Sequence, residues 1–382
     1  MTDTTDWSLS MECGGRSPTE TGDTKPIWSV PDYNFRTLPT TNVKGHGPQR
    51  GHIRRGAQDL HLYRLRDVYI GTSGVIYDRF GRIFLPHLAP FITPELKNIR
   101  SYAYALHNYG ITLLSDRGKV QMKGSPFEAS RTVEEPVFVA SSYWERAYTH
   151  FFLELLPSIL HYRKRVDPAV RLLLSDSIAA SRGGFLEMLG LSDRVVTKGP
   201  DEVVFAREVW VTDYPRLCGP ENAELLLEAF APHFDPAVRN TEPPVYIARH
   251  DAFAWDRRLL NEEELLREMP ERGIEVFVPS GLPLAQQLDK LWRSRLVIGM
   301  YGGAMFNLLL GMREKHSLLL CSENYNRFDY DGLAPALGHR SAKLLCRSFE
   351  SRRDANNSPV FISPTPFWAL VQELLREQQA GS

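Results

Sequence analysis

Residues 296–307 read LVIGMYGGAMFN and lead into a further apolar run. The apolar block Leu296–Met300 predicts a buried strand, and Ala304–Met312 predicts a helix. Gly302 and Gly303 stand between them. Small residues at this point let the backbone approach a ligand, and a helix start attracts anions. The stretch matches neither GxGxxG nor a phosphate-binding Walker loop, and a tight strand-to-helix turn without a ligand has the same pattern.

Alternation of strand and helix continues on both sides and predicts an α/β fold with mainly parallel sheets. In the C-terminal half we expect strands at 245–248, 275–278, 317–321 and 343–345, and helices at 261–269, 284–293 and 368–377. Asn261, with Glu264 three residues on, fits a capping box. In the N-terminal half we expect strands at 171–174, 195–196 and 203–211, and helices at 144–164, 184–188 and 221–231. Pro157 is expected to kink or divide the first of these helices.

Three further stretches predict the domain organisation. Residues 1–55 are rich in Thr, Gly, Pro, Asp and Arg, which is typical of a flexible arm. Short strands are expected next, at 60–65, 68–70, 75–78, 82–85 and 137–140. The polar, proline-bearing stretch 232–244 is interpreted as a linker. We therefore predict an arm (1–55) and two Rossmann-like α/β domains (56–235 and 236–382), the first with a β-rich addition.

Composition excludes several classes of protein. The chain has 45 Lys and Arg against 46 Asp and Glu, so it has no basic excess for a nucleic-acid backbone. It contains no run of 18 apolar residues that would cross a membrane, and its start lacks the pattern of a secretory signal. Its 4 cysteines lie far apart, without a CxxC pair. We therefore expect a cytoplasmic protein that has no disulfides and no cysteine metal site. If its substrate is lipid-linked, we expect the protein to be peripheral at the inner face of the membrane.

The stretch HFFLE, His150–Glu154, places an imidazole and a carboxylate four residues apart. On a helix these two side chains share a face, and such a pair suits general-base catalysis. A structural ion pair has the same spacing. The neighbouring residues are strongly apolar, however, which disfavours a pair that is only exposed to solvent on the surface.

A second polar group follows the expected strand at 245–248. Arg249 stands at its carboxyl end, and Arg257 and Arg258 precede the expected helix with Asn261 and Glu262. Guanidinium groups beside a helix start suit a diphosphate, although the same residues also suit a solvated loop that forms salt bridges with the glutamates.

Three segments in this order resemble glycosyltransferase family 61, in particular its bacterial capsular-polysaccharide-type branch. They are HFFLELLP (150–157), YIAR with the downstream RR and NEEEL (246–265), and VIGMYGGAMFN (297–307). The resemblance covers roughly residues 135–325. It implies a GT-B-like fold, in which an acceptor-side domain and a nucleotide-sugar-binding domain face a cleft.

The resemblance also implies an inverting transfer of a hexosyl or pentosyl unit from a nucleotide-sugar, with a UDP-sugar favoured, to a glycan or glycolipid. Glu154 matches the family's proposed base and His150 the histidine before it, while Arg249 matches the arginine that meets the donor phosphates. The remaining expected donor-binding residues are Arg257, Arg258, Asn261, Glu262, Tyr301, Gly302, Gly303, Asn307 and Glu323. In this interpretation, positively charged side chains that contact the leaving phosphates take the place of a metal ion, so no metal and no cofactor are expected.

The last segment departs from the family, which usually has His-Gly-Ala where this chain has Tyr301-Gly302-Gly303. Tyrosine donates a hydrogen bond but carries no positive charge. A relative that binds a nucleotide-sugar without turnover therefore remains an alternative. A third hypothesis uses Asp329 and Asp331 as a DxD pair that holds a metal ion in a metal-dependent transferase.

Overall fold

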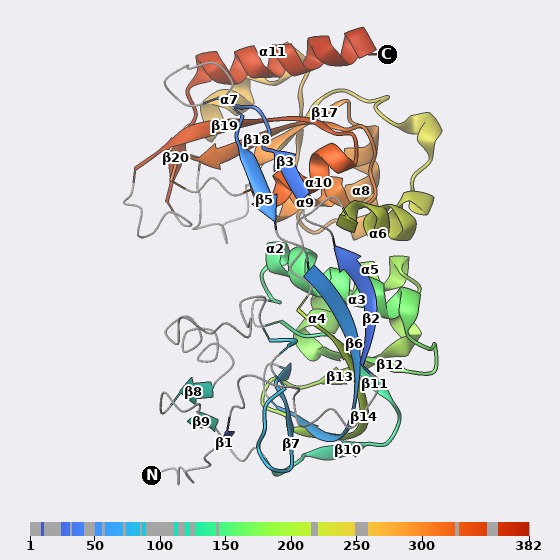
Figure 1. Ribbon diagram of the computed structural model, residues 1–382. Helices are drawn as coiled ribbons and strands as arrows, with labels where there is room; N and C mark the ends of the chain where they lie inside the picture. Colours follow the sequence, from blue (N-terminus) through green and yellow to red (C-terminus); the bar gives the residue numbers. More distant parts are fainter. Residues whose placement is uncertain are drawn as a thin grey trace. The chain divides into compact units, whose positions relative to one another are not determined.

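A computed structural model describes residues 9–10, 24–30, 33–41, 50–55, 58–71, 74–84, 86–88, 111–113, 119–122, 127–142, 145–214, 221–248, 259–324, 328–349 and 358–381 (Figure 1). The chain forms two compact units. Unit 1 comprises Met1–Pro31 and Ala57–Leu217, and unit 2 comprises Asp32–Gly56 and Cys218–Ser382. Each unit contains a parallel sheet with helices, so the predicted α/β class is confirmed.

Unit 1 is built on a sheet in the order β13-β12-β11-β14-β6-β2. Its strands are β1 (Leu9–Ser10), β2 (Thr24–Val30), β6 (Gln58–Ile70), β7 (Ile76–Asp78), β8 (Ile111–Leu113), β9 (Lys119–Met122), β10 (Arg131–Val133), β11 (Val137–Val139), β12 (Arg171–Ser175), β13 (Val195–Lys198) and β14 (Val204–Thr212). Its helical segments are α2 (Tyr148–His150), η2 (Phe151–Leu155), α3 (Leu156–Arg165), α4 (Asp176–Ser181), α5 (Gly183–Met188) and η3 (Ser192–Arg194). Strand β11 pairs in parallel with both β12 and β14. Strands β12 and β13 lie on one side of β11 and β14 lies on the other, so the strand order switches between β11 and β14. Ligands of open parallel sheets bind at the carboxyl ends of the strands at such a switch point.

Unit 2 has a second parallel sheet, in the order β16-β15-β17-β18-β19, with its switch point between β15 and β17. Its strands are β3 (Tyr33–Arg36), β4 (Thr40–Thr41), β5 (His52–Arg55), β15 (Val245–Ile247), β16 (Glu275–Phe277), β17 (Leu296–Met300), β18 (His316–Ser322), β19 (Arg340–Ser348) and β20 (Val360–Phe361). Its helical segments are α6 (Glu221–Phe230), η4 (Ala231–His233), η5 (Pro236–Val238), α7 (Glu262–Glu268), η6 (Pro270–Arg272), α8 (Leu284–Arg293), α9 (Gly303–Phe306), η7 (Asn307–Leu309), α10 (Asp329–Ala336) and α11 (Pro364–Gly381).

Several expected elements differ from the structure. The two short strands expected at 60–65 and 68–70 form one strand, β6, because it pairs with β14 from Leu62 to Ile70. No strand forms at the described part of 82–85, because the Asp78 carboxylate accepts the N–H groups of Phe80 and Arg82 and closes a turn. The helix expected over 304–312 ends early, and Gly311 stands there with a φ of 68°.

The predicted flexible arm also differs from the structure in its described residues. Strand β2 pairs with β6 of unit 1, whereas β4 pairs with β19 of unit 2. Composition does not show this pairing, because both partner strands lie far away in the sequence. Residues 1–8, 11–23, 31–32 and 42–49 of the predicted arm lie outside the described part of the chain.

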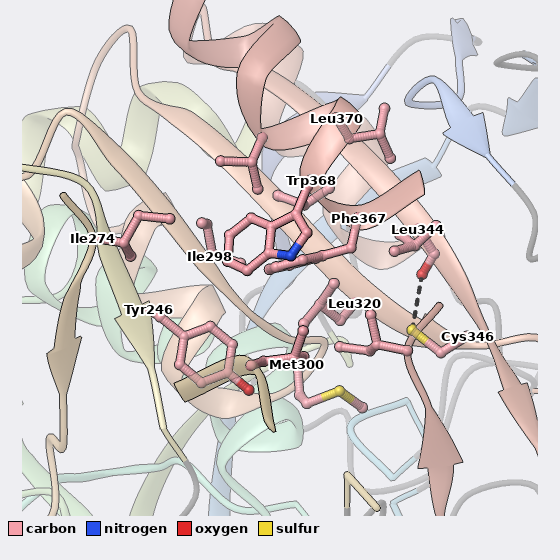
Figure 2. Packing of buried hydrophobic residues seen from close by; sticks show 14 of the residues in the cluster. Tyr246, Ile274, Ile298, Met300, Leu320, Leu344, Cys346, Phe367, Trp368 and Leu370 are labelled. Carbon is pink, nitrogen blue, oxygen red and sulfur yellow. Dashed lines mark hydrogen bonds between the residues drawn. The ribbon is translucent and has the colours of Figure 1, made fainter. Parts of the chain in front are cut away.

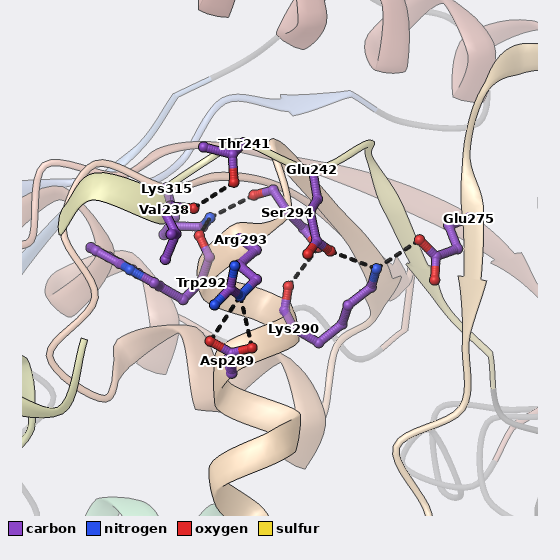
Figure 3. A network of polar contacts seen from close by, with 10 residues as sticks. All are labelled: Val238, Thr241, Glu242, Glu275, Asp289, Lys290, Trp292, Arg293, Ser294 and Lys315. Carbon is purple, nitrogen blue, oxygen red and sulfur yellow. Dashed lines mark hydrogen bonds and ion pairs between the residues drawn. The ribbon is translucent and has the colours of Figure 1, made fainter. Parts of the chain in front are cut away.

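The core of unit 2 lies between the sheet and α11. Figure 2 shows Phe367, Trp368 and Leu370 of α11 above Ile298 and Leu320, and all of these side chains are buried. Lys315, directly before β18, belongs to a polar network (Figure 3). The Lys315 ammonium is fully buried and donates to Asn240 Oδ1 at 2.6 Å, Trp292 O at 2.9 Å and Ser294 O at 2.6 Å, which stabilises the carboxyl end of α8.

Buried histidines make the fold sensitive to acid. His339 donates from Nε2 to Met312 O at 2.7 Å, and burial lowers its pKa to about 4. An unfolded histidine has a pKa near 6.5, so below that pH the unfolded chain binds a proton that the folded protein excludes. The free energy of unfolding should therefore decrease by up to about 3 kcal/mol from this residue between pH 6.5 and pH 4. We expect urea titrations at several pH values to show a smaller decrease for His339→Gln. The exposed His233→Gln should retain the full decrease, and an equal decrease in all three proteins would contradict this assignment.

Candidate active site

The chain around His150 and Glu154 winds as a π-helix. Between α2 and α3, the five residues Phe151–Leu155 form η2, and all five are buried. Pro157 lies in the first turn of α3, where its missing N–H is tolerated. The prediction that Pro157 divides the helix thus agrees with a change of helix type directly before it, whereas the expected start at Trp144 lies outside the described residues. π-Turns are rare and are frequent at functional sites.

The structure brings His150 and Glu154 together. His150 Nδ1 lies 2.6 Å from Glu154 Oε1, and Ser142 Oγ donates to Glu154 Oε2 at 2.6 Å. The Glu154 side chain is only 1% exposed, whereas that of His150 is 29% exposed. The carboxylate is thus enclosed, and the imidazole is the member of the pair that solvent reaches.

The partners of Glu154 hold its pKa low. Burial raises the pKa of Glu154, but hydrogen bonds and charge from His150, with hydrogen bonds from Ser142 and Tyr214, outweigh burial and hold the pKa below its usual value. Glu154 is therefore a carboxylate at neutral pH and accepts the Nδ1 proton of His150. In the neutral form of an imidazole that donates from Nδ1, Nε2 is the proton acceptor.

The residues that hold Glu154 place it at the switch point of unit 1. Ser142 follows β11, and Tyr214 follows β14. These two strands are parallel neighbours, so their carboxyl ends meet at one edge of the sheet. Neither residue was predicted from the sequence, because each lies only two or three residues after a strand and belongs to no motif. That position, rather than any motif, is the signal that would have pointed to them.

The expected donor-binding residues of unit 2 form separate contacts. Tyr301, Gly302 and Gly303 directly follow β17, at the switch point with β15. Tyr301 is 3% exposed, and its hydroxyl donates to Asp329 Oδ2 at 3.4 Å. The preceding Gly299 is required by packing, because a Cβ there would lie 2.9 Å from Met305 Sδ.

Three other expected residues have structural partners. Asn261 is buried and binds the backbone of Ile362 through both its oxygen and its nitrogen. Its side chain therefore does not cap α7, and the predicted capping box is wrong. Glu262 accepts from Tyr246 Oη at 2.8 Å, and Glu323, which follows β18, accepts from Ser348 N at 3.0 Å.

Asn307 is buried at the start of η7. Arg249, Arg257 and Arg258 lie outside the described residues.

The structure disfavours the DxD hypothesis. Asp331 lies within α10 instead of the polar loop expected from sequence, and its side chain is fully buried. Its carboxylate pairs with Lys343 and accepts the Leu38 N–H at 2.7 Å. Both oxygens are thus engaged, so Asp331 is not placed to bind a metal ion. Among the described residues, no group of three His, Cys, Asp or Glu side chains is arranged to hold one.

Comparison with known proteins identifies one family. The model of Glycosyltransferase 61 matches residues 148–319, a stretch that begins just before His150 and includes Tyr301–Gly303 but ends before Asp329. No curated protein matches the chain. No helix of the described residues has the length and apolar character needed to cross a membrane. Over residues 148–319 the chain resembles glycosyltransferase family 61, which indicates a glycosyltransferase.

Proposed function

We propose that this chain is an inverting, metal-independent glycosyltransferase that moves a hexosyl or pentosyl unit from a nucleotide-sugar to a glycan hydroxyl in polysaccharide synthesis. The observation that carries the proposal is the His150–Glu154 pair, which lies within the family match and at the switch point of a parallel sheet. A UDP-sugar is the favoured donor, and the two units correspond to the acceptor and donor sides of a GT-B-like enzyme.

In this proposal His150 is the base, and Glu154 is the residue that positions it. The sequence suggested the reverse, but the Glu154 carboxylate is enclosed and already accepts from Ser142 and His150. The acceptor oxygen attacks the anomeric carbon while its proton moves to His150 Nε2. The bond from that carbon to the diphosphate breaks, and its electron pair leaves with the nucleoside diphosphate. The buried carboxylate stabilises the imidazolium that forms, as in serine hydrolases.

The donor site is proposed at the carboxyl edge of unit 2. Tyr301, Gly302 and Gly303 stand at the switch point there, and Arg249 follows β15 by two residues in the sequence. Backbone N–H groups and guanidinium groups stabilise a departing diphosphate without a metal. Arg257, Arg258, Glu262, Asn307 and Glu323 remain proposed donor residues, and Asn261 is proposed to act through the backbone that it holds.

A nucleotide-binding screen tests this function. We expect calorimetry to detect saturable binding of one of UDP, GDP, CMP and dTDP, with UDP the first candidate. EDTA should leave the affinity unchanged, and Arg249→Ala should weaken it at least tenfold, since charge-assisted contacts to phosphate are lost. Arg267→Ala is the matched control, because Arg267 is an exposed arginine of α7.

Other outcomes would contradict parts of the proposal. Binding that EDTA abolishes would mean a metal-dependent enzyme. Binding of a nucleotide-sugar without its consumption, across a panel of glycoside acceptors, would mean a relative that binds without turnover. Absence of any nucleotide binding would overturn the donor site.

A further inference from the structure

A pocket of about 450 Å³ lies in unit 1, at the carboxyl ends of β11, β12 and β13. This volume is within the range of small-molecule sites. Its wall is formed by residues at the carboxyl ends of three strands and by five others. These are 139–142 at the end of β11, 173–177 at the end of β12 and 198–200 at the end of β13, together with Ile70, Gly74, Glu145, Arg146 and Ala147. The pocket is thus formed by the same sheet edge that holds Glu154.

The polar groups of this pocket are charged but balanced. The lining contains two acidic residues, Glu145 and Asp176, and two basic residues, Arg146 and Lys198. Burial raises the pKa of Glu145 and lowers that of Lys198, so neither side chain is a strongly hydrated surface charge. A diphosphate would meet two carboxylates here, which disfavours a nucleotide. A neutral ligand with many hydroxyl groups donates to carboxylates and accepts from ammonium and serine hydroxyl groups.

The acidic side chain in the pocket is held in place. Glu145 Oε1 accepts from Ser175 Oγ at 2.5 Å, and Glu145 Oε2 accepts from Ser142 N at 3.3 Å. Ser175 also caps α4 by accepting from Ile178 N at 3.3 Å. A carboxylate fixed in this way is a preorganised acceptor for a ligand hydroxyl.

One residue connects the pocket to the catalytic pair. Ser142 lines the pocket, donates its N–H to Glu145 and donates its hydroxyl to Glu154. A ligand in the pocket would therefore lie against Ser142, which itself contacts the Glu154 carboxylate that holds His150.

We propose that this pocket binds the terminal sugar of the acceptor as a neutral, hydroxyl-rich ring, with Glu145, Ser175 and Lys198 as its recognition residues. The proposal rests on the proposed transferase function. It assigns acceptor choice to the residues at the carboxyl ends of β11, β12 and β13.

The test measures sugar binding without any reaction. Saturation-transfer NMR on the full chain would use methyl glycosides of glucose, galactose, xylose and N-acetylglucosamine as probes, with and without UDP. We expect at least one glycoside to bind and Glu145→Gln to weaken it about tenfold, because a charge-assisted hydrogen bond is lost. Ala147→Trp, which changes an exposed lining residue, should block binding without touching the fold-stabilising contacts of Glu145. The exposed Asp193→Asn serves as the matched control.

The outcomes separate this proposal from the transferase proposal. If UDP binds but no glycoside does, or if both pocket variants bind the glycoside like wild type, the pocket assignment is overturned while the donor site stands. If a glycoside binds and the variants weaken it but no nucleotide binds, the pocket stands as a sugar site and the transferase function falls. If the pocket variants weaken UDP instead, the pocket is a nucleotide site and the proposal is wrong.

Discussion

Replacing His150 with Ala should lower kcat by about 10²–10⁴-fold and leave nucleotide affinity unchanged, because the loss is that of a general base. Glu154→Gln should cause a loss of similar size. A neutral amide no longer holds the proton on Nδ1, and in serine proteases the equivalent change costs about 10⁴ in kcat. The measurement is transfer to a methyl glycoside at saturating donor, with nucleotide affinity determined in parallel.

Chemical rescue distinguishes a base from a residue that only supports the fold. Added imidazole should restore part of the activity of His150→Ala but none of that of Glu154→Gln. Glu187→Gln, an exposed glutamate of α5 in the same unit, is the matched control and should behave like wild type. If His150→Ala retains full activity while Glu154→Gln abolishes it, Glu154 itself is the base and the proposed order of the pair is wrong.

The contact between His150 and Glu154 was predictable because its signal is local. Spacing of four residues brings His150 and Glu154 to one helix face, and the structure confirms their contact despite the π-turn. The hydrophobic pattern likewise predicted β17 and α8 with the bounds that the structure has. These elements are defined by continuous apolar blocks or by a clear helical period, which a single sequence displays.

The remainder of the site depends on contacts between distant residues. Ser142 and Tyr214 reach Glu154 from the ends of two strands, and the exposure that separates the proposed roles of His150 and Glu154 is a property of the folded unit. Asn261 looked like a helix cap, but its side chain binds Ile362, which lies 101 residues away. In each case a local pattern was present, and a long-range hydrogen bond decided how the side chain is used.

The buried pair Asp331–Lys343 should be the most sensitive point of unit 2. Both side chains are fully buried, and Asp331 also accepts from Leu38 N, a residue 293 positions earlier. Lys343 N donates to Pro39 O at 2.8 Å, so this pair joins the segment with β4 to β19. Asp331→Ala leaves a buried ammonium and a buried N–H without their partner, and should lower the free energy of unfolding by about 3–5 kcal/mol.

A comparison of variants separates the ion pair from simple loss of packing. The double variant Asp331→Leu, Lys343→Met should lose less stability than Asp331→Ala, because it removes both charges together and leaves neither uncompensated. Glu268→Ala breaks the exposed pair with Arg272, whose atoms lie 2.8 Å apart, and should cost less than about 1 kcal/mol. Urea unfolding measures all four proteins. A cost below about 1 kcal/mol for Asp331→Ala would contradict the structural role. A carboxylate held by Lys343 and Leu38 has no oxygen left for a cation, so Mn²⁺ should not stabilise the wild type through Asp331. If Mn²⁺ does stabilise the wild type and Asp331→Ala abolishes this effect, Asp331 is a metal ligand after all.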